Sequence, residues 1–222
     1  MSKFSGFLEF DGKFVHTGTY KNKIPFIYAI DFFTHDIPHG MLVPSENYLA
    51  CRKFFSDLKS INYPLKYLVC DDNNNIKLAA IDIYPDVVIQ TCTKHFLESI
   101  RDTLNTKTCN KYLPFVIDVE SIFTLRLASW ELVWKIQDIY NKYNNDPKTM
   151  FWMSEIIRRK EELTNYHMFI DAPNTTNLIE VYNSHLEGRL KTIKGFESFH
   201  SARRWLNAYI IKRRTHFKMQ SI

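Results

Sequence analysis

Three acidic side chains stand where they could bind divalent cations. Asp11 lies in the predicted strand LEFDGKFV, and Asp71 follows the apolar run YLVC. A carboxylate within or at the end of a hydrophobic strand is unfavourable unless it is paired, hydrogen-bonded or bound to a cation. Glu180 lies in the helical pattern NLIEVYNSHLEGRL, flanked by apolar residues. Carboxylates of this kind suit hard cations such as Mg²⁺, which prefer oxygen ligands.

Each of these acids also has a structural interpretation. Asp11 could cap a turn. Asp71, which is followed by Asp72 and the run NNN, could cap a helix, because Asp and Asn are favoured N-cap residues. Glu180 could face water, and Glu187 in the same pattern is its rival for any role. Two acids that both end apolar strands nevertheless favour a site, because ligands of α/β sheets usually bind at strand ends.

The first half of the chain has the pattern of an α/β sheet. Runs rich in β-branched and aromatic residues predict strands in FLEFDGKFV, IPFIYAIDFF, HGMLVPS, PLKYLVCD and VVIQTC. Apolar residues three and four apart predict helices at 45–61, with Ser45 as N-cap, at 76–84 and at 95–104. Strands that alternate with helices after a meander predict a sheet with helices on its faces.

The pattern becomes helical beyond Pro114. One helix is predicted at 121–143 and another at 149–163, separated by a turn sequence. Trp130 and Trp134 are one helical turn apart and Trp152 lies in the next helix. We predict that these tryptophans form the core of a helical hairpin rather than contact DNA. Further helices are predicted at 177–190 and 195–214.

The composition is that of an ordered, moderately basic chain. Its 222 residues are 45% hydrophobic and carry a net charge of +5, which permits a polyanionic partner without requiring one. Positive charge gathers in the last predicted helix, at Arg203, Arg204, Lys212 and Arg213, where a solvated helix face is the alternative. The four cysteines contain no C-x-x-C pair and predict a reduced, intracellular protein. We expect no membrane span, because the sequence contains no apolar run of about 18 residues.

Residues 71–95, DDNNNIKLAAIDIYPDVVIQTCTKH, resemble a stretch of Mutator-type (MULE-like) transposases and their bacterial insertion-sequence relatives. The likeness comprises an aspartate, a helix with small residues, the pair Tyr84-Pro85 and a C-x-x-H formed by Cys92 and His95. Aligning these features places the family's aspartate at Asp71.

Three further segments resemble the same family, among them SENYLACRKFFSDL, which is similar to its helix before the second aspartate. The residues around Asp11 are similar to its first-aspartate strand and hairpin. The segment TTNLIEVYNSHLEGRL is similar to its glutamate helix, with Asn177 and Glu180 in an N-x-x-E arrangement. The resemblance covers roughly residues 8–115 and 174–209.

The resemblance implies a ribonuclease-H-like fold, with a mixed sheet flanked by helices and an all-helical insertion before the last acid. Residues 1–116 would form the first part of the core, 117–172 the insertion and 173–222 the completion of the core. The implied activity is that of a DDE transposase, which cleaves and transfers DNA strands with two Mg²⁺ or Mn²⁺ ions bound by Asp11, Asp71 and Glu180.

The implied partner is double-stranded DNA, both transposon ends and target, on which the chain would form a homo-oligomer. Basic residues of the last helix would contact phosphates without reading sequence. The implied compartment is the cytoplasm and nucleoid in a bacterium, or the nucleus in a eukaryote.

Two points keep other interpretations open. Structural zinc requires four ligands, so Cys92 and His95 alone do not predict zinc. His95 could contact DNA or orient an acid, and packing explains the pair equally well. Such transposases normally carry an N-terminal DNA-binding region, whereas the likeness here begins near Leu8. A truncated or repurposed, non-catalytic DNA-binding derivative is therefore the alternative function.

Overall fold

The computed structural model describes residues 4–193 and 195–220, with the backbone alone at 215–220. The chain forms two compact units. The first comprises Met1–Ile89 together with Thr176–Ile222, and the second comprises Gln90–Thr175. The predicted division at residues 116 and 172 remains a prediction.

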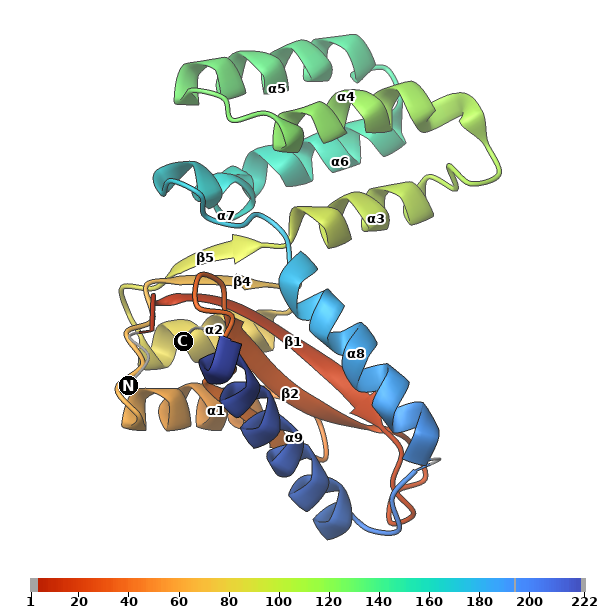
Figure 1. Cartoon of the computed structure of the whole chain (residues 1–222). Coiled ribbons are helices and arrows are strands. Elements are labelled where there is room, and N and C mark those ends of the chain that lie inside the picture. Colours follow the sequence, from red (N-terminus) through yellow and green to blue (C-terminus); the bar gives the residue numbers. More distant parts are fainter. Residues whose placement is uncertain (1–3, 194, 221–222) are drawn as a thin grey trace. The chain divides into compact units, whose positions relative to one another are not determined.

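A mixed five-stranded sheet is the centre of the fold (Figure 1), with the strand order β3-β2-β1-β4-β5. The strands are β1 (Phe7–Val15), β2 (Ile24–Asp31), β3 (His39–Leu42), β4 (Tyr67–Cys70) and β5 (Val88–Thr91). The first three form an antiparallel meander, and β4 pairs with β1 in parallel. All five predicted strands are present, and the α/β class is confirmed.

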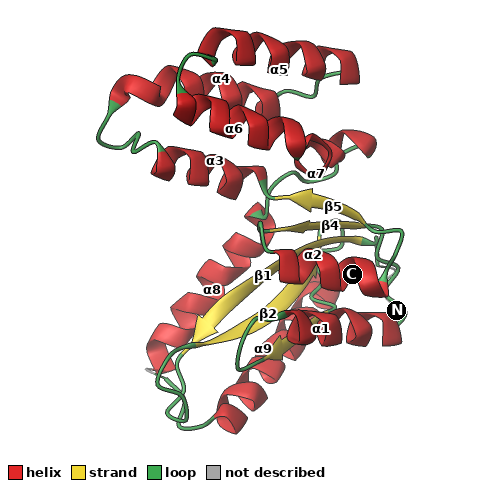
Figure 2. Ribbon diagram, turned by 180° about the vertical axis from the view of Figure 1, so that it is seen from behind, coloured by secondary structure: helices red, strands yellow, loops and turns green. Residues whose placement is uncertain are grey.

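Helices cover both faces of this sheet. Helices α8 (Asn177–Ile193) and α9 (Phe199–Gln220) lie on one face in Figure 1, and α1 (Tyr48–Ser60) and α2 (Asn74–Ile83) lie on the other, as Figure 2 shows. Alternation along the strands produces the two layers, because successive side chains point to opposite faces. In β2, Ile27 packs in the core under α1, whereas Phe26 and Tyr28 pack in the core under α8 and α9.

The start of α1 differs from the prediction. Ser45 is not the N-cap. Asn47 fills this position, and its side chain accepts a hydrogen bond from the Ala50 amide. The helix therefore begins at Tyr48, and Glu46 lies ahead of the cap instead of in the first turn. Glu46 therefore belongs to the loop before α1 rather than to the helix.

The second unit is largely helical. Its helices are α3 (Thr93–Thr103), α4 (Leu113–Thr124), α5 (Ser129–Tyr143), α6 (Pro147–Arg158) and α7 (Lys160–Thr164), with short 3₁₀ turns at Asn110–Tyr112 and Asn165–Met168. The single helix predicted at 121–143 is wrong. The backbone is extended at Leu125, and α5 begins anew where the Ala128 amide donates to the Glu131 carboxylate.

Two of the three tryptophans contradict the prediction of a shared core. Trp152 is buried, but Trp130 is 65% and Trp134 is 73% exposed. The buried face of α5 consists of Leu132, Ile136 and Ile139. Their spacing of three and four residues defines one face of the helix, and both tryptophans fall outside it.

None of the described helices combines the length and the apolar character that crossing a bilayer requires.

Candidate active site

Helix α8 runs along β1 and contacts three alternate residues of the strand. The Ile179 amide donates to the Glu9 carboxylate over 2.9 Å, and the Asn183 side-chain amide donates to Asp11 Oδ2. One turn further, Lys13 Nζ lies 2.8 Å from a carboxylate oxygen of Glu187. The spacing of these contacts matches both elements. Side chains on one face of a strand recur every two residues, and side chains on one face of a helix recur every three to four residues.

The strand register brings Asp71 towards Asp11. β1 and β4 are parallel, with Leu8 opposite Leu68 and Glu9 opposite Val69. Continued by two residues, this register sets Asp11 opposite Asp71, and adjacent strands are about 4.8 Å apart. Both acids line one pocket of about 380 Å³.

Glu46 is a third carboxylate of this pocket. Its Oε1 accepts a 2.9 Å hydrogen bond from Asn73, which also caps α2 by accepting from the Asn75 amide. A Cβ atom added at Gly12 would lie only 2.9 Å from Glu46 Oε2, so glycine permits this close approach. Burial raises the pKa of Glu46, and the nearby Asp71 carboxylate raises it further, against the lowering effect of the Asn73 hydrogen bond.

Glu9 connects this group of acids to Glu180. The Glu9 side chain is buried, and burial is the main reason that its pKa is raised to about 7. Backbone hydrogen bonds from Ile179 and Leu178 lower this pKa, whereas the charges of Glu180 and Asp11 raise it. Both carboxylates are therefore close enough to Glu9 to repel its charged form.

The neighbouring acids that compete for these roles are engaged with lysines. Asp72 forms a 2.8 Å ion pair with the buried Lys77. Glu187 binds Lys13 and Lys191, and these contacts lower its pKa. The N-cap role considered for Asp71 belongs to Asn73.

Glu180 occupies the first turn of α8, half-buried, and Thr176 Oγ1 lies 3.4 Å from its Oε1. Asn177, the first residue of this helix, is exposed. Cys92 and His95 belong to the second unit, where Cys92 is buried at the start of α3 and His95 is half-buried in its first turn.

The basic residues of α9 separate onto different sides of the helix. Lys212 and Arg213 line one pocket, and Arg203 lines another. Arg204 is exposed. The sequence predicted one basic surface along this helix. The helical repeat instead places the four residues on different sides of the helix.

The donor set fits a hard divalent cation. Asp11, Asp71 and Glu46 offer carboxylate oxygens in one pocket, which are the ligands that Mg²⁺ and Mn²⁺ prefer. Lys and Arg are absent from the described residues that line this pocket. Burial and the charges of neighbouring acids disfavour the charged forms of Glu9 and Glu46, and a bound cation would offset that cost.

Comparison with known families identifies the lineage of the chain. A family model described as the Mutator family of transposases matches residues 37–220. The chain belongs to the Mutator family of transposases. This membership confirms the resemblance found in the sequence, and it suggests a function in DNA transposition. The match includes Asp71 and Glu180, whereas Asp11 precedes it, so the inclusion of Asp11 rests on geometry. No match was found among curated proteins.

Sequence reasoning missed two acids that lie near Asp11, Glu9 and Glu46. Glu9 left a signal, because it alternates with Asp11 in an apolar strand and so shares its face. Glu46 left none, since it resembled an ordinary acid in a first helical turn.

Proposed function

We propose that this Mutator-family chain is a DDE transposase catalytic domain, which cleaves and transfers DNA strands with two Mg²⁺ or Mn²⁺ ions bound by Asp11, Asp71 and Glu180. The observation that carries the proposal is the pocket in which Asp11, Asp71 and Glu46 converge. Bound there, the ions would supply Lewis-acid activation of water or a 3′-hydroxyl and charge stabilisation of the leaving oxygen. Glu46 is the added candidate ligand.

The protein's own contribution is to fix Asp11 before substrate arrives. The Gly12 amide donates to Asp11 Oδ1 over 2.6 Å, and Asn183 donates to Oδ2. Asn183 is itself held, because the buried Tyr28 hydroxyl donates to its Oδ1 over 2.9 Å. A carboxylate oriented in this way loses little entropy when it binds an ion.

A second pocket suggests where the DNA backbone approaches. This pocket, of about 480 Å³, shares Asp11 and Gly12 with the acidic one. Its lining includes Lys13, Lys23 and Lys191. Lysines beside the acids would neutralise phosphates and hold a strand across Asp11. Further phosphate contacts would come from basic residues of α9, the exposed Arg203, Arg204 and Lys212 and the half-buried Arg213.

The proposal includes the fold and the assembly. An antiparallel three-strand meander followed by β4, which pairs with β1 in parallel, supports a ribonuclease-H-like core. Residues 1–116 and 173–222 would form this core, with 117–172 as the helical insertion. The chain would act as a homo-oligomer on DNA, with Asn177, Cys92 and His95 as accessory residues.

A nicking assay with a matched pair of variants tests the activity. We expect Mg²⁺- or Mn²⁺-dependent nicking of supercoiled DNA, reduced more than about 1000-fold in Asp71→Asn. The control is Asp72→Asn, which removes the same charge from a residue paired with Lys77 and should remain within about threefold of wild type. Equal activity in wild type and Asp71→Asn would refute the catalytic assignment. DNA binding without metal-dependent nicking would instead support the non-catalytic derivative.

A further inference from the structure

A pocket between α8 and α9 combines aromatic rings with positive charge. Its volume is about 600 Å³. From α8 it is lined by His185 and Arg189, and from α9 by Trp205, Ala208, Tyr209, Lys212 and Arg213. Asp and Glu are absent from these described lining residues. The proposed acid site uses none of these side chains.

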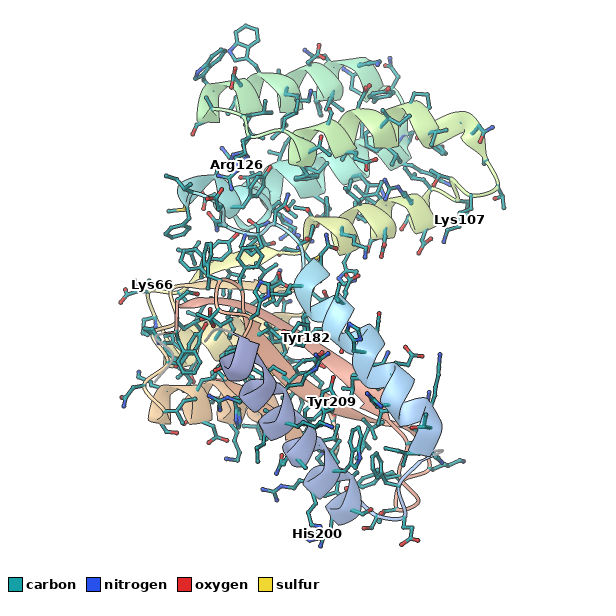
Figure 3. The ribbon with its side chains drawn as sticks, viewed as in Figure 1. Lys66, Lys107, Arg126, Tyr182, His200 and Tyr209 are labelled. Atoms are coloured by element: carbon teal, nitrogen blue, oxygen red, sulfur yellow. The ribbon has the colours of Figure 1, made fainter. Side chains whose placement is uncertain are left out.

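The aromatic part of the pocket is a stacked pair. The rings of Trp205 and Tyr209 lie 5.6 Å apart with an interplanar angle of 12°. Trp205 is half-buried and also contacts the Phe196 ring at 5.7 Å. The Arg213 guanidinium lies between Tyr209 and Tyr182, 5.9 Å and 5.0 Å from their ring centroids. Figure 3 labels Tyr182 on α8 and Tyr209 on α9. Contacts with Phe196 and Arg213 hold these two rings in place, so they form a preordered platform.

The charged part of the pocket faces solvent. His185 and Arg189 are exposed and one turn apart on α8, and Lys212 is exposed on α9. Exposed cations around a recessed aromatic surface match a ligand that carries both a flat ring and anionic groups. A phosphate alone would gain nothing from the stacked rings, and an apolar ligand would gain nothing from the cations.

We propose that this pocket binds an unpaired nucleotide segment of a DNA strand, with a base stacked on the Trp205–Tyr209 pair and phosphates held by Arg189 and Lys212. Stacking on aromatic side chains inside a basic groove is the general mode of single-strand binding. A base inside a duplex is already stacked and cannot present its face to a recessed ring. The inference takes DNA as partner from the proposed function, but it does not depend on the acids.

The test uses the full chain in EDTA, so that no cleavage occurs, with a fluorescently labelled oligothymidylate followed by anisotropy. We expect Trp205→Leu to weaken binding about tenfold. The same substitution should not weaken the binding of an abasic oligomer of the same length, which keeps the phosphates but lacks the bases. If Trp205→Leu folds, as judged by its thermal melt, and binds both oligomers as wild type does, the proposal is wrong.

Exposed charge variants keep the test decisive if Trp205→Leu fails to fold. Arg189→Gln should weaken binding of both oligomers and reduce the salt slope, d log K/d log[salt], by about 0.7. The matched control is Arg52→Gln, which removes the same charge from an exposed residue of α1, on the opposite face of the sheet, and should leave oligomer binding unchanged. No loss in Arg189→Gln, or an equal loss in both variants, overturns the site.

Two further results separate this inference from the proposed catalysis. Asp71→Asn should bind the oligomer normally, even where it abolishes nicking. An unlabelled duplex of the same length should compete poorly for the pocket. A duplex that competes as well as the single strand would show that the pocket recognises phosphate alone and would overturn the assignment.

Discussion

Two carboxylate sites of the same sheet have opposite surroundings. Asp31, at the end of β2, is buried and accepts hydrogen bonds from the amides and hydroxyls of Ser5 and Thr34 and from the Tyr63 hydroxyl. Burial, followed by the charge of Asp31, raises the pKa of Tyr63, which therefore stays a donor. At the other site, Asp11 has acids for neighbours.

The difference teaches how to distinguish a structural acid from a functional one. Asp31 is surrounded by donors, so the fold itself compensates its charge. Near Asp11, burial and the charges of Glu180 and Asp11 raise the pKa of Glu9, and burial and the charge of Asp71 raise that of Glu46. We therefore expect an external cation to stabilise a site of the second kind but not a site of the first kind.

The largest expected effect concerns activity. Glu180→Gln should reduce metal-dependent nicking more than about 1000-fold. Glu187→Gln, on the same helix, breaks ion pairs with Lys13 and Lys191 and should cost no more than about fivefold. Initial rates at saturating Mg²⁺ compare the two. A larger loss in Glu187→Gln would reverse the assignment of the glutamate.

Stability should respond most at the structural site. Asp31→Asn should lower the free energy of unfolding by about 3 kcal/mol, because an amide cannot replace the charged acceptor of several hydrogen bonds. Urea denaturation measures the change. Asp102→Asn is the control, since its carboxylate is 66% exposed and paired with an exposed lysine, and its effect should be close to zero. A similar, small change in the free energy of unfolding in both variants would show that the hydrogen-bond donors around Asp31 do not stabilise the fold.

Glu9 should make the stability of the metal-free protein depend on pH. Its pKa of about 7 lies above the ordinary 4.5, so the folded state holds the proton more tightly than the unfolded state. The stabilisation is complete below pH 4.5 and is lost as the pH rises through 7, a fall in unfolding free energy of roughly 3 kcal/mol.

Denaturation in EDTA between pH 5 and pH 8 measures this fall. Glu9→Gln should flatten the profile, while Glu98→Gln, at an exposed position, should keep it. An identical slope in wild type and Glu9→Gln would show that Glu9 is not the titrating group.

The smallest expected effect is the stabilisation of the protein by a bound cation, which should depend on Asp11 but not on Asp31. Mn²⁺ at ten times its dissociation constant should raise the free energy of unfolding by about 1.4 kcal/mol. The shift should disappear in Asp11→Asn and persist in Asp31→Asn, because only the first removes a proposed ligand. Differential scanning calorimetry with and without Mn²⁺ distinguishes them, and a shift that survives in Asp11→Asn would place the ion elsewhere.

Local pattern determined much of this protein. Runs rich in β-branched and aromatic residues predicted the five described strands, and the apolar run ended by Asp71 indicated the edge of the sheet at which the site is proposed. The expectation that Asp11 also ends a strand is wrong, because β1 continues to Val15. These features depend on neighbours along the chain, which the sequence displays directly. The family, too, could be recognised from the sequence, through the motif that begins at Asp71 and the glutamate helix around Glu180.

Tertiary structure alone decided the rest. Which face of α5 is buried depends on the helices packed against it, so the exposure of Trp130 and Trp134 could not be read from their spacing. The proximity of Glu46 to Asp71 depends on the conformation of the loop before α1, because Glu46 directly precedes the Asn47 N-cap. The separation of Arg203 from Lys212 depends on which elements flank α9. In each case local sequence determines the helix or strand and the spacing of its faces. Which side chains are buried or in contact depends on the elements that pack against it in the folded protein.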